Sequence, residues 1–260
     1  MGHRWIVILG ASSGFGAASA RAFARAGYAI FGAHMDRRGA QPQIDALIAD
    51  LRAEGVPVVF HNGNAADDEE RKRTLESLTA AVTEDGGEVG VLLHSLAFGT
   101  LRPYFDADAP MQRRQIEMTL DVMAHSLVYW AQDLVREGLI GEGGRIYAMT
   151  SAGSLVAWPS YGAVSAAKCA LESHIRQLAV ELAGRGVTAN AIMAGVTRTP
   201  ALEKIPGADQ LANSALARNP HRRLTTPEDV ANCLVELARP GTAWLTGNVI
   251  HVDGGESISG

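Results

Sequence analysis

A glycine-rich turn directly after a short apolar run is the feature that most constrains how this chain can fold. Residues 5–9 are continuously apolar, and a turn with glycines at 10, 14 and 16 separates them from a helical pattern over residues 16–26. Such a turn lets backbone N–H groups approach a pyrophosphate at the positive end of the helix. We therefore expect a dinucleotide here, against the simpler alternative of a structural turn built from small residues. The expected cofactor contacts are Gly10, Ser12, Ser13, Gly14, Phe15 and Gly16.

Short apolar runs alternate with longer amphipathic stretches along the whole chain. The runs predict strands at residues 5–9, 29–31, 56–60, 89–93, 145–149, 188–193 and 249–252. The stretches predict helices at residues 16–26, 41–54, 67–85, 111–137, 159–183 and 227–238. Continuously apolar strands between helices indicate a parallel sheet that is covered on both faces. We expect an α/β fold: one doubly wound, Rossmann-type domain over residues 1–260, with a mostly seven-stranded parallel sheet.

One segment, residues 199–226, fits neither the helical nor the strand period. It is rich in Ala, Pro and Asn, and it lies between the sixth predicted strand and the last predicted helix. Mobile segments of enzymes often close over a bound substrate. We therefore interpret residues 199–226 as a mobile substrate-loop insertion within the single domain.

Composition and charge argue against several classes of function. The formal net charge is −5 and no basic cluster stands out, which argues against nucleic-acid binding. The two cysteines are isolated, and no His, Cys or carboxylate spacing suits a metal, so neither disulfides nor a metal site is expected. No apolar run reaches the length of about 18 residues that a membrane span requires, and the first run is too short for a signal peptide. We expect a cytoplasmic protein that does not bind membranes.

Further motifs along the chain resemble the short-chain dehydrogenase/reductase superfamily. The Gly-x-x-x-Gly-x-Gly spacing of the turn is typical of that superfamily, and Val252-Asp253-Gly254-Gly255 resembles its last strand and turn. Asn64-Ala65 resembles the pair that holds the adenine, and the segment that contains Gly195 and Thr197 resembles the one that grips the nicotinamide amide. The resemblance implies a nicotinamide cofactor held in part by these four residues.

The end of the second predicted strand bears on which nicotinamide cofactor binds. An acid there would bind the ribose hydroxyls and repel a 2′-phosphate, but His34 stands at that place and Asp36 comes two residues later. Arg37 and Arg38 follow, and each could pair with a phosphate through two hydrogen bonds. The sequence thus favours NADPH and allows NADH. The alternative is that the two arginines form a solvated loop face.

The candidate catalytic tyrosine is displaced from the place that is standard in this superfamily. Its members carry Tyr-x-x-x-Lys, whereas here Tyr161 precedes Lys168 by seven residues and Val164 occupies the usual tyrosine position. Residues seven apart still share one face of a helix, at a rise of about 10.5 Å in place of about 6 Å. The tyrosine hydroxyl is therefore expected one turn further from the nicotinamide end.

This displacement has a chemical meaning. In ketone reduction, the hydride reaches the same carbonyl carbon whose oxygen the tyrosine protonates. In reduction of an enoyl thioester, the hydride reaches the β-carbon, and negative charge develops on the more distant thioester oxygen. A donor moved along the helix suits the second reaction, because stabilisation must be aimed at the atom where charge develops. The spacing therefore favours reduction of a C=C bond.

The same spacing resembles the enoyl-acyl-carrier-protein reductases within the superfamily. The segment His94-Ser95-Leu96-Ala97-Phe98 is similar to their His-Ser-x-Ala-Phe motif, which implies cofactor contacts from Ser95, Leu96 and Ala97. Met123 stands at the position of the standard catalytic asparagine, so the usual asparagine-linked proton relay is missing. The segment Gly99-x-Leu101-Arg102-Pro103 and the standard glycine turn make the type III branch the closest resemblance.

The resemblance implies roles for three side chains. Tyr161 would donate a hydrogen bond to the enolate oxygen, and Lys168 would bind the ribose hydroxyls and lower the pKa of Tyr161 through its charge. Ser151, seventeen residues before Lys168, matches the catalytic serine of standard ketoreductases. It would act as a supporting donor, or else only cap the end of a strand. His94 and His125 lack metal spacing and are interpreted as structural residues.

Together these residues predict an NADPH-preferring enoyl thioester reductase of fatty acid synthesis, with a possible acyl carrier protein as partner and a homotetrameric assembly as in similar proteins. Basic residues in or beside residues 199–226 could bind the acidic carrier: Arg198, Lys204, Arg218, His221, Arg222 and Arg223. Two alternatives stay open. Ser151 favours a carbonyl reductase of the 3-ketoacyl or hydroxysteroid type, which Val164 and Met123 disfavour. A non-catalytic NADP(H)-binding regulator is disfavoured by the intact Tyr161 and Lys168.

Overall fold

The seven runs predicted as strands form one parallel sheet in the computed structural model, which describes residues 2–259. The strands are β1 (Arg4–Leu9), β2 (Ala29–His34), β3 (Val58–Asn62), β4 (Glu88–His94), β5 (Arg145–Thr150), β6 (Thr188–Ala194) and β7 (Val249–Val252). Their order across the sheet is β3-β2-β1-β4-β5-β6-β7, and each neighbouring pair is parallel. The chain builds outward from β1 to β3 and then returns to add β4 beside β1. That reversal is the topological switch point, at which doubly wound folds bind their ligands.

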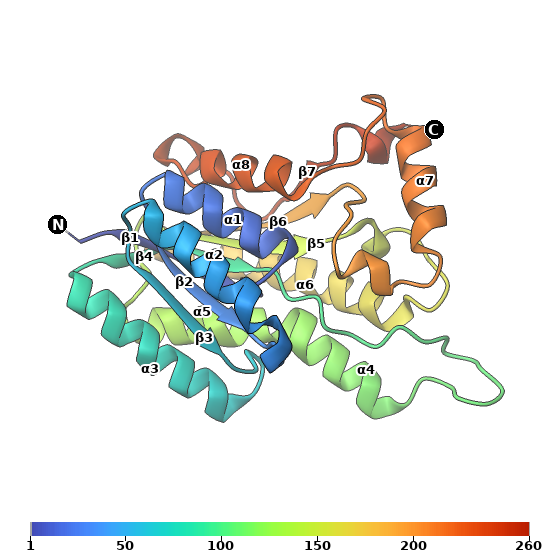
Figure 1. The fold of residues 1–260 in the computed structure, drawn as a ribbon, viewed down its shortest axis with the longest axis horizontal. Coiled ribbons are helices and arrows are strands. Elements are labelled where there is room, and N and C mark those ends of the chain that lie inside the picture. The colour runs from blue at the N-terminus through green and yellow to red at the C-terminus, as the bar shows by residue number, and fades with distance from the viewer. Residues whose placement is uncertain (1, 260) are drawn as a thin grey trace.

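The helices cover both faces of the sheet, as the continuously apolar strands predicted. They are α1 (Gly14–Arg25), α2 (Gln41–Ala53), α3 (Asp68–Asp85), α4 (Arg113–Leu120), α5 (Ser126–Arg136), α6 (Gly162–Glu181), α7 (Ala208–Arg218) and α8 (Pro227–Leu237). One buried cluster joins the sheet to α1, α2 and α8, and a second joins it to α3, α5 and α6 (Figure 1). Strand β1 sends Ile6 to the first cluster and Val7 to the second, because successive strand side chains point to opposite faces. None of the helices within residues 2–259 is long and apolar enough to cross a membrane.

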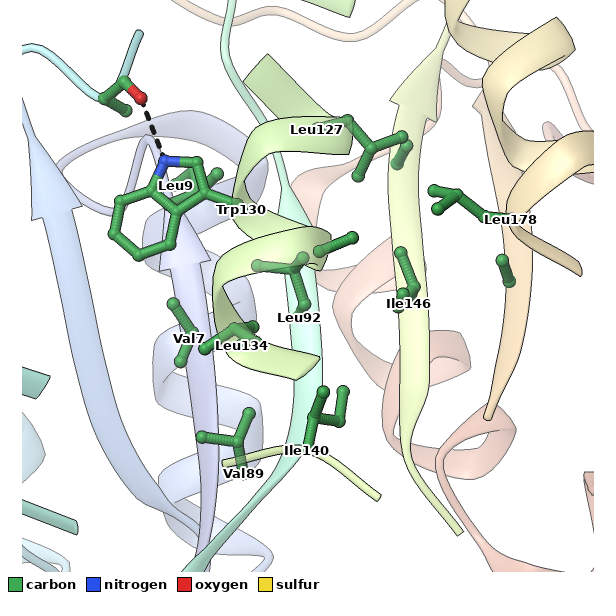
Figure 2. Packing of buried hydrophobic residues seen from close by; sticks show 14 of the residues in the cluster. Val7, Leu9, Val89, Leu92, Leu127, Trp130, Leu134, Ile140, Ile146 and Leu178 are labelled. Atoms are coloured by element: carbon green, nitrogen blue, oxygen red, sulfur yellow. Dashed lines mark hydrogen bonds between the residues drawn. The ribbon is translucent and has the colours of Figure 1, made fainter. Parts of the chain in front are cut away.

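Figure 2 shows how the second cluster continues to the ligand end of the sheet. Trp130 of α5 is fully buried among apolar side chains that include Leu9 of β1 and Leu134 of α5. Its indole N–H donates a hydrogen bond to the Ala65 carbonyl oxygen over 2.9 Å. A buried indole N–H needs such a partner, because leaving it unpaired would cost free energy. This bond fixes the turn after β3, which the sequence predicts to contact the adenine.

Two regions differ from the sequence prediction. The helix predicted over residues 111–137 consists of α4, a π-helical turn at Asp121–His125, and α5. The prediction that residues 199–226 lack regular structure is wrong, since they contain α7 and a 3-10 turn at Leu202–Lys204. Only Ala212 and Ala215 of α7 are buried, so its apolar stripe is too narrow to produce a clear helical period.

Two segments extend beyond the carboxyl ends of the strands, at the right of Figure 1. One is α7, and the other is the connection from β4 to α4, residues 95–112. Within this connection, the Thr100 N–H donates to Thr119 Oγ1 over 3.0 Å and the Met111 N–H donates to the Pro103 carbonyl oxygen over 3.2 Å. These bonds anchor both sides of the exposed tip. The two segments therefore flank the end of the sheet at which a ligand is expected.

Candidate active site

The glycine turn after β1 has the geometry that a close approach between backbone and ligand requires. Gly10 and Gly14 adopt φ angles of +91° and +51°, in the left-handed region that favours glycine. A Cβ atom at Gly16 would overlap the carbonyl oxygen of Gly10. The turn leads directly into α1, whose first N–H groups have no partner within the helix. A pyrophosphate fits this cradle, since the turn presents backbone donors and no side chain could replace the glycines.

Segments that follow β4 and β6 meet at this turn. A Cβ atom at Gly10 would lie 2.5 Å from the Ser95 carbonyl oxygen and 3.5 Å from Leu96 Cδ2. On the other side, a Cβ atom at Gly14 would lie 3.5 Å from Thr199 Cγ2. The structure thus brings the glycine turn, the start of the β4–α4 connection and the segment after β6 together at the switch point. These are three of the segments that the sequence predicts to bind the cofactor.

The end of β2 differs in detail from the expectation. His34 is buried, and its Nδ1 lies 3.0 Å from Asp36 Oδ2. The backbone of Asp36 is paired with the Asn62 amide, through an N–H donor (3.2 Å) and a carbonyl acceptor (3.0 Å). Arg37 and Arg38 are exposed and take part in no ion pair within residues 2–259. Asp36 is therefore held at the edge formed by β2 and β3, through His34 and Asn62. The side chains of Arg37 and Arg38 stay available to a phosphate.

The turn after β3 is shaped by Asn64. Its Oδ1 accepts a hydrogen bond from the Ala66 N–H over 3.0 Å, and its own N–H donates to a carboxylate oxygen of Glu70. The next residue, Ala65, is buried, and its carbonyl oxygen is held by Trp130. Asn64 and Ala65 therefore form a fixed turn next to the β2–β3 edge. Their contact with an adenine stays a prediction.

The predicted catalytic residues lie around the carboxyl end of β5 and the start of α6. Tyr161 immediately precedes α6, and its Oη lies 3.5 Å from Ser151 Oγ, just after β5. Ser151 Oγ also accepts from the Gly153 N–H over 3.3 Å, so the serine both caps a turn and faces the tyrosine. Lys168 is 5% exposed, and its Nζ donates to the Met149 carbonyl oxygen over 2.6 Å. The structure thus places all three predicted side chains around one strand end.

The backbone on either side fixes the Tyr161 ring. A Cβ atom at Gly153 would overlap the ring, so glycine is required for this contact. Ser165 of α6 donates from its Oγ to the Gly153 carbonyl oxygen, which ties the helix to the preceding loop. Ser160 has a φ of +63°, a left-handed conformation that strains a residue with a Cβ. The loop between β5 and α6 is therefore closely fitted to the tyrosine that follows it.

Burial sets the charge states at this strand end. It lowers the pKa of Lys168 to about 8, while the nearby Glu172 carboxylate acts in the opposite direction. Burial raises the pKa of Tyr161, and the hydrogen bond with Ser151 opposes that rise. Desolvation of the phenol therefore dominates, and the pKa of Tyr161 lies above its ordinary value despite the lowering predicted from the charge of Lys168. Tyr161 is a neutral hydrogen-bond donor at neutral pH.

The position that a standard tyrosine would occupy is filled by apolar groups. A Cβ atom at Gly99 would lie 3.0 Å from both Met123 Sδ and Val164 Cγ2, and 2.7 Å from Thr119 Cγ2. Met123 belongs to the π-helical turn and Val164 to the first turn of α6, and both are buried. The side chains at the places of the standard tyrosine and asparagine therefore both pack against the backbone of Gly99. Neither a phenol nor an amide is present there. The hydroxyl groups that the site offers instead are those of Tyr161 and Ser151.

His94 is a buried structural residue, as predicted. Its Nε2 lies 2.8 Å from Ser126 Oγ, and that hydroxyl donates its one proton to the Val122 carbonyl oxygen over 2.8 Å. Burial lowers the pKa of His94 to about 3, so the imidazole is neutral and its Nε2–H is the donor. These bonds tie β4 to the π-helical turn. His125 Nδ1 lies 2.9 Å from His174 Nε2, and no group of three or more candidate metal ligands occurs among residues 2–259.

The segment after β6 is held by neighbours on both sides. Thr197 Oγ1 donates to the Gly195 carbonyl oxygen over 2.9 Å, and the Val196 N–H donates to Glu256 Oε2 over 3.1 Å. A Cβ atom at Gly195 would overlap Thr225 Oγ1. Sequence analysis missed Glu256, because a single acid after a glycine pair gives no local signal of a partner 60 residues away.

Sequence analysis also missed the apolar residues around the site. Phe98, Leu155 and Val156, on the connections after β4 and β5, are 51%, 72% and 64% exposed. Tyr104 packs its ring on Gly162, where a Cβ atom would lie 2.6 Å from Tyr104 Cζ. Exposed apolar residues near one end of a molecule mark a surface for an apolar partner or ligand. Their sequence signal is weak, because single apolar residues are common in loops.

The basic residues predicted to receive an acidic carrier are partly neutralised. Arg198 Nη1 lies 2.8 Å from Asp209 Oδ1. Arg223 makes two hydrogen bonds to the Asp229 carboxylate, at 2.5 and 2.9 Å. Arginines in such pairs offer less charge to a partner than free ones. The structure therefore gives a weaker basic surface than the sequence predicted.

Fold and site together define the class of this protein. A doubly wound parallel sheet, a glycine cradle at its switch point and a buried lysine with a serine–tyrosine pair at the end of β5 define a nicotinamide-dependent oxidoreductase of the short-chain dehydrogenase/reductase type. The chain belongs to the enoyl-(acyl carrier protein) reductase family, whose pattern matches residues 10–257. The resemblance predicted from the Tyr161–Lys168 spacing is confirmed.

The chain is similar to proteins within and beyond this family. The enoyl-acyl-carrier-protein reductase (NADH) of Nostoc sp. is 29% identical over 226 residues, which are 86% of this chain and 84% of that protein. The L-rhamnose 1-dehydrogenase (NAD(P)(+)) of Sphingomonas sp. is 28% identical over 257 residues, 98% of this chain and 96% of that protein. The crystal structure of the enoyl-acyl-carrier-protein reductase (NADH) from Aquifex aeolicus VF5 matches with a TM-score of 0.84 and 25% identity, covering 99% and 97% of the two chains.

Proposed function

We propose that this protein reduces the C=C bond of an enoyl thioester in fatty acid synthesis, with NADPH preferred over NADH. The observation that carries this proposal is the position of the phenol. Tyr161 lies before the first turn of α6 beside Ser151, whereas apolar Val164 fills the position of a standard tyrosine. A donor displaced along the helix suits a reaction in which charge develops away from the carbon that accepts the hydride.

Each side chain has a distinct task in this proposal. The nicotinamide, when bound, supplies the hydride. Lys168 of α6, whose Nζ donates to the Met149 carbonyl oxygen near the end of β5, binds the ribose hydroxyls through its ammonium group. Tyr161, kept protonated by its raised pKa, donates a hydrogen bond to the thioester oxygen as charge develops there. Ser151 orients the phenol from 3.5 Å.

The cofactor is proposed to lie along the switch point. The glycine turn holds the pyrophosphate, Asn64 and Ala65 hold the adenine, and residues 95–97 line the middle of the site. Gly195 and Thr197 hold the nicotinamide amide. The cradle at Gly10 and the packing of the later segments against it support this arrangement.

The preference for NADPH rests on Arg37 and Arg38, which are exposed beside the end of β2. Asp36, a carboxylate that could bind ribose hydroxyls, is already engaged by His34. The Nostoc and Aquifex relatives carry NADH in their names, which makes NADH the competing choice. The ratio of kcat/KM for the two cofactors decides between them: a ratio above one supports the proposal, and its loss in Arg37→Ala and Arg38→Ala variants assigns the preference to these side chains.

An apolar acyl group is the proposed substrate moiety. Phe98, Leu155 and Val156 present apolar surface where the connections after β4 and β5 leave the sheet. A sugar, by contrast, requires a dense set of polar partners in its pocket. The acyl group is proposed to be delivered by an acyl carrier protein in the cytoplasm, with coenzyme A as the competing carrier.

A homotetramer is the proposed assembly. Trp244 is 98% exposed, and Leu245 and Val180 are exposed as well. Large apolar side chains with this exposure are typical of surfaces that associate. Light scattering after size-exclusion chromatography gives the mass directly, and a monomer of 27.5 kDa would contradict this assembly.

A carbonyl reductase is the second candidate function. The contact between Ser151 and Tyr161 favours it, since a serine–tyrosine pair is also what polarisation of a ketone requires. The similarity to the L-rhamnose 1-dehydrogenase (NAD(P)(+)) over nearly the whole chain is compatible with that chemistry. The buried Met123 and Val164 disfavour it.

One experiment separates the two functions. Consumption of NADPH and NADH is followed with a trans-2-enoyl thioester and with the matching 3-ketoacyl thioester, for the wild type and for Tyr161→Phe. We expect faster turnover of the enoyl substrate, and a loss of about 100-fold or more in kcat for the variant, the size expected for a donor to an oxyanion. Turnover of the ketone alone would establish the carbonyl reductase. Tight cofactor binding without turnover of either substrate would establish a regulator.

A further inference from the structure

One buried carboxylate at the cofactor end has no role in the mechanism above. Glu256 follows β7, begins a short 3-10 turn (Glu256–Ile258) and is 6% exposed. Its Oε2 accepts a hydrogen bond from the Val196 N–H over 3.1 Å, and its Oε1 lies 3.9 Å from Arg218 Nη2. Because burying a carboxylate costs free energy unless it is paired, these two partners are what holds it in place.

The two partners of Glu256 belong to different parts of the site. Val196 lies between Gly195 and Thr197, the residues proposed to hold the nicotinamide amide. Arg218 is the last residue of α7, the helix that extends beyond the sheet on the substrate side (Figure 1). A single carboxylate therefore joins the cofactor segment to the substrate-side helix.

The surroundings leave the carboxylate little freedom to move. A Cβ atom at Gly195 would lie 2.8 Å from Glu256 Oε2, so only glycine permits this approach. The Asp253 carboxylate accepts hydrogen bonds from two backbone N–H groups of the same turn, over 2.9 and 3.0 Å. The Asp253 carbonyl oxygen accepts from Asn219 Nδ2 over 2.9 Å, immediately after α7. The turn after β7 is thus rigid and attached to the end of α7.

We propose that Glu256 is a positioning residue that seats residues 195–197 against the nicotinamide and couples this seating to the position of α7. This inference rests on the proposed cofactor contacts of Gly195 and Thr197. A displacement of α7 moves Arg218 away from the Glu256 carboxylate. The carboxylate is then less firmly fixed, and its hydrogen bond from the Val196 N–H is weakened. Cofactor and acyl substrate therefore strengthen each other's binding, by the same factor in each direction.

The test is direct titration of NADPH and NADH by fluorescence, together with KM and kcat for the enoyl thioester. Glu256→Ala removes the acceptor and should weaken cofactor binding about tenfold, because the partly buried Val196 N–H loses its partner. Glu256→Gln keeps an oxygen for that N–H and loses the charge, so cofactor binding in the absence of substrate should change less than about threefold. Glu84→Gln, which removes an exposed carboxylate of α3, is the control of equal charge and should match the wild type.

The coupling to α7 is tested by Arg218→Gln and by the double variant Glu256→Gln/Arg218→Gln. The two single variants should raise KM for the thioester several-fold with little change in kcat, and the double variant should equal either single one, because both remove the same interaction. They should also abolish the gain in cofactor affinity that saturating acyl thioester gives the wild type.

Three results would overturn the proposal. The first is unchanged cofactor affinity in a folded Glu256→Ala protein, and the second is additive effects of Glu256→Gln and Arg218→Gln. The third is a fall in kcat with no change in either affinity. If Glu256→Ala does not fold, the two glutamine variants decide, since Glu256→Gln keeps the side-chain volume and Arg218 is exposed. Cofactor titration needs no turnover, so a failure of the proposed reaction is distinguishable from a failure of this inference.

Discussion

Two sides of the candidate site are held together by different kinds of contact. The cofactor side is the glycine turn after β1, and the substrate side is the β5–α6 loop with α7. On the cofactor side, the turn at Gly10 and Gly16 packs backbone directly on backbone, with no space for an added atom. On the substrate side, side chains bridge the segments: Trp158 Nε1 donates to the Pro206 carbonyl oxygen over 3.0 Å, and Arg198 pairs with an acid of α7. Backbone contacts cannot adapt to a larger residue, whereas side-chain bridges can be weakened singly. Substitutions on the cofactor side should therefore have the larger effects.

The largest effect is expected for Gly16→Ala. The new Cβ would overlap the Gly10 carbonyl oxygen, so the turn must shift before a pyrophosphate can bind. We expect cofactor affinity to fall about 100-fold, measured by fluorescence titration alongside the melting temperature. Gly184→Ala is the matched control, because no atom lies near the added Cβ there. A cofactor affinity of Gly16→Ala within a factor of two of the wild type would contradict the expectation that substitutions on the cofactor side have the larger effects.

A smaller effect is expected from pH, through Lys168. Its pKa of about 8 lies below the ordinary value, so the ammonium is intact at pH 7 and loses its proton as the pH rises through 8. The proposed bonds to the ribose need that ammonium, so cofactor affinity should fall about tenfold between pH 7 and 9. Titrations across this range in the wild type and in Lys168→Arg, whose charge persists, measure the effect. A flat profile for the wild type would remove Lys168 from cofactor binding.

On the substrate side, Trp158→Phe should have a moderate effect. The change removes the indole N–H that holds the Pro206 carbonyl oxygen and keeps an aromatic ring against Gly207. One hydrogen bond of this kind contributes about 1 kcal/mol, so KM for the thioester should rise about fivefold. Cofactor affinity should stay unchanged, and Trp158→Ala should show a larger rise in KM. A fall in cofactor affinity would show that the two sides are not independent at this point.

The smallest effect is expected for Ser160→Gly, at the boundary between the two sides. Ser160 has a φ of +63°, which glycine adopts without strain. We expect a gain of about 0.5–1 kcal/mol, or about 2 °C in the melting temperature of a chain of this size. Ser160→Ala should instead leave the melting temperature close to that of the wild type, since it keeps the Cβ and with it the strain. A lower melting temperature in the glycine variant would show that the left-handed conformation is not a source of strain.

The difference between local contacts and contacts of distant segments also decides how much could be predicted from the sequence. The glycine turn and the seven strands were predicted because each depends on residues close together in the chain. The spacing between Tyr161 and Lys168 could be read from the sequence for the same reason, although Tyr161 immediately precedes α6 and does not share a helix face with the lysine. The contacts of Glu256 could not be, since its partners, Val196 after β6 and Arg218 at the end of α7, lie in distant parts of the sequence. Contacts between distant segments leave no periodic pattern.

Two further elements were missed for physical reasons of their own. Helix α7 buries only two alanines, so tertiary contacts and not an apolar stripe define it. The π-helical turn at Asp121–His125 lies within a continuous helical pattern, and one wider turn changes that pattern too little to be seen. The placement of Met123 beside Val164 follows from that turn and needed the three-dimensional structure.

The packing of Met123 and Val164 on Gly99 has a consequence for substitutions in this chain. A tyrosine introduced at 164 alone would meet Met123 and the backbone of Gly99, which are already in contact with the smaller side chain. An asparagine introduced at 123 alone would be buried among apolar groups. Each single replacement should therefore destabilise the fold, and a joint replacement is needed to restore a polar relay. The apolar pair is thus a packing unit that single substitutions cannot convert stepwise without a loss of stability.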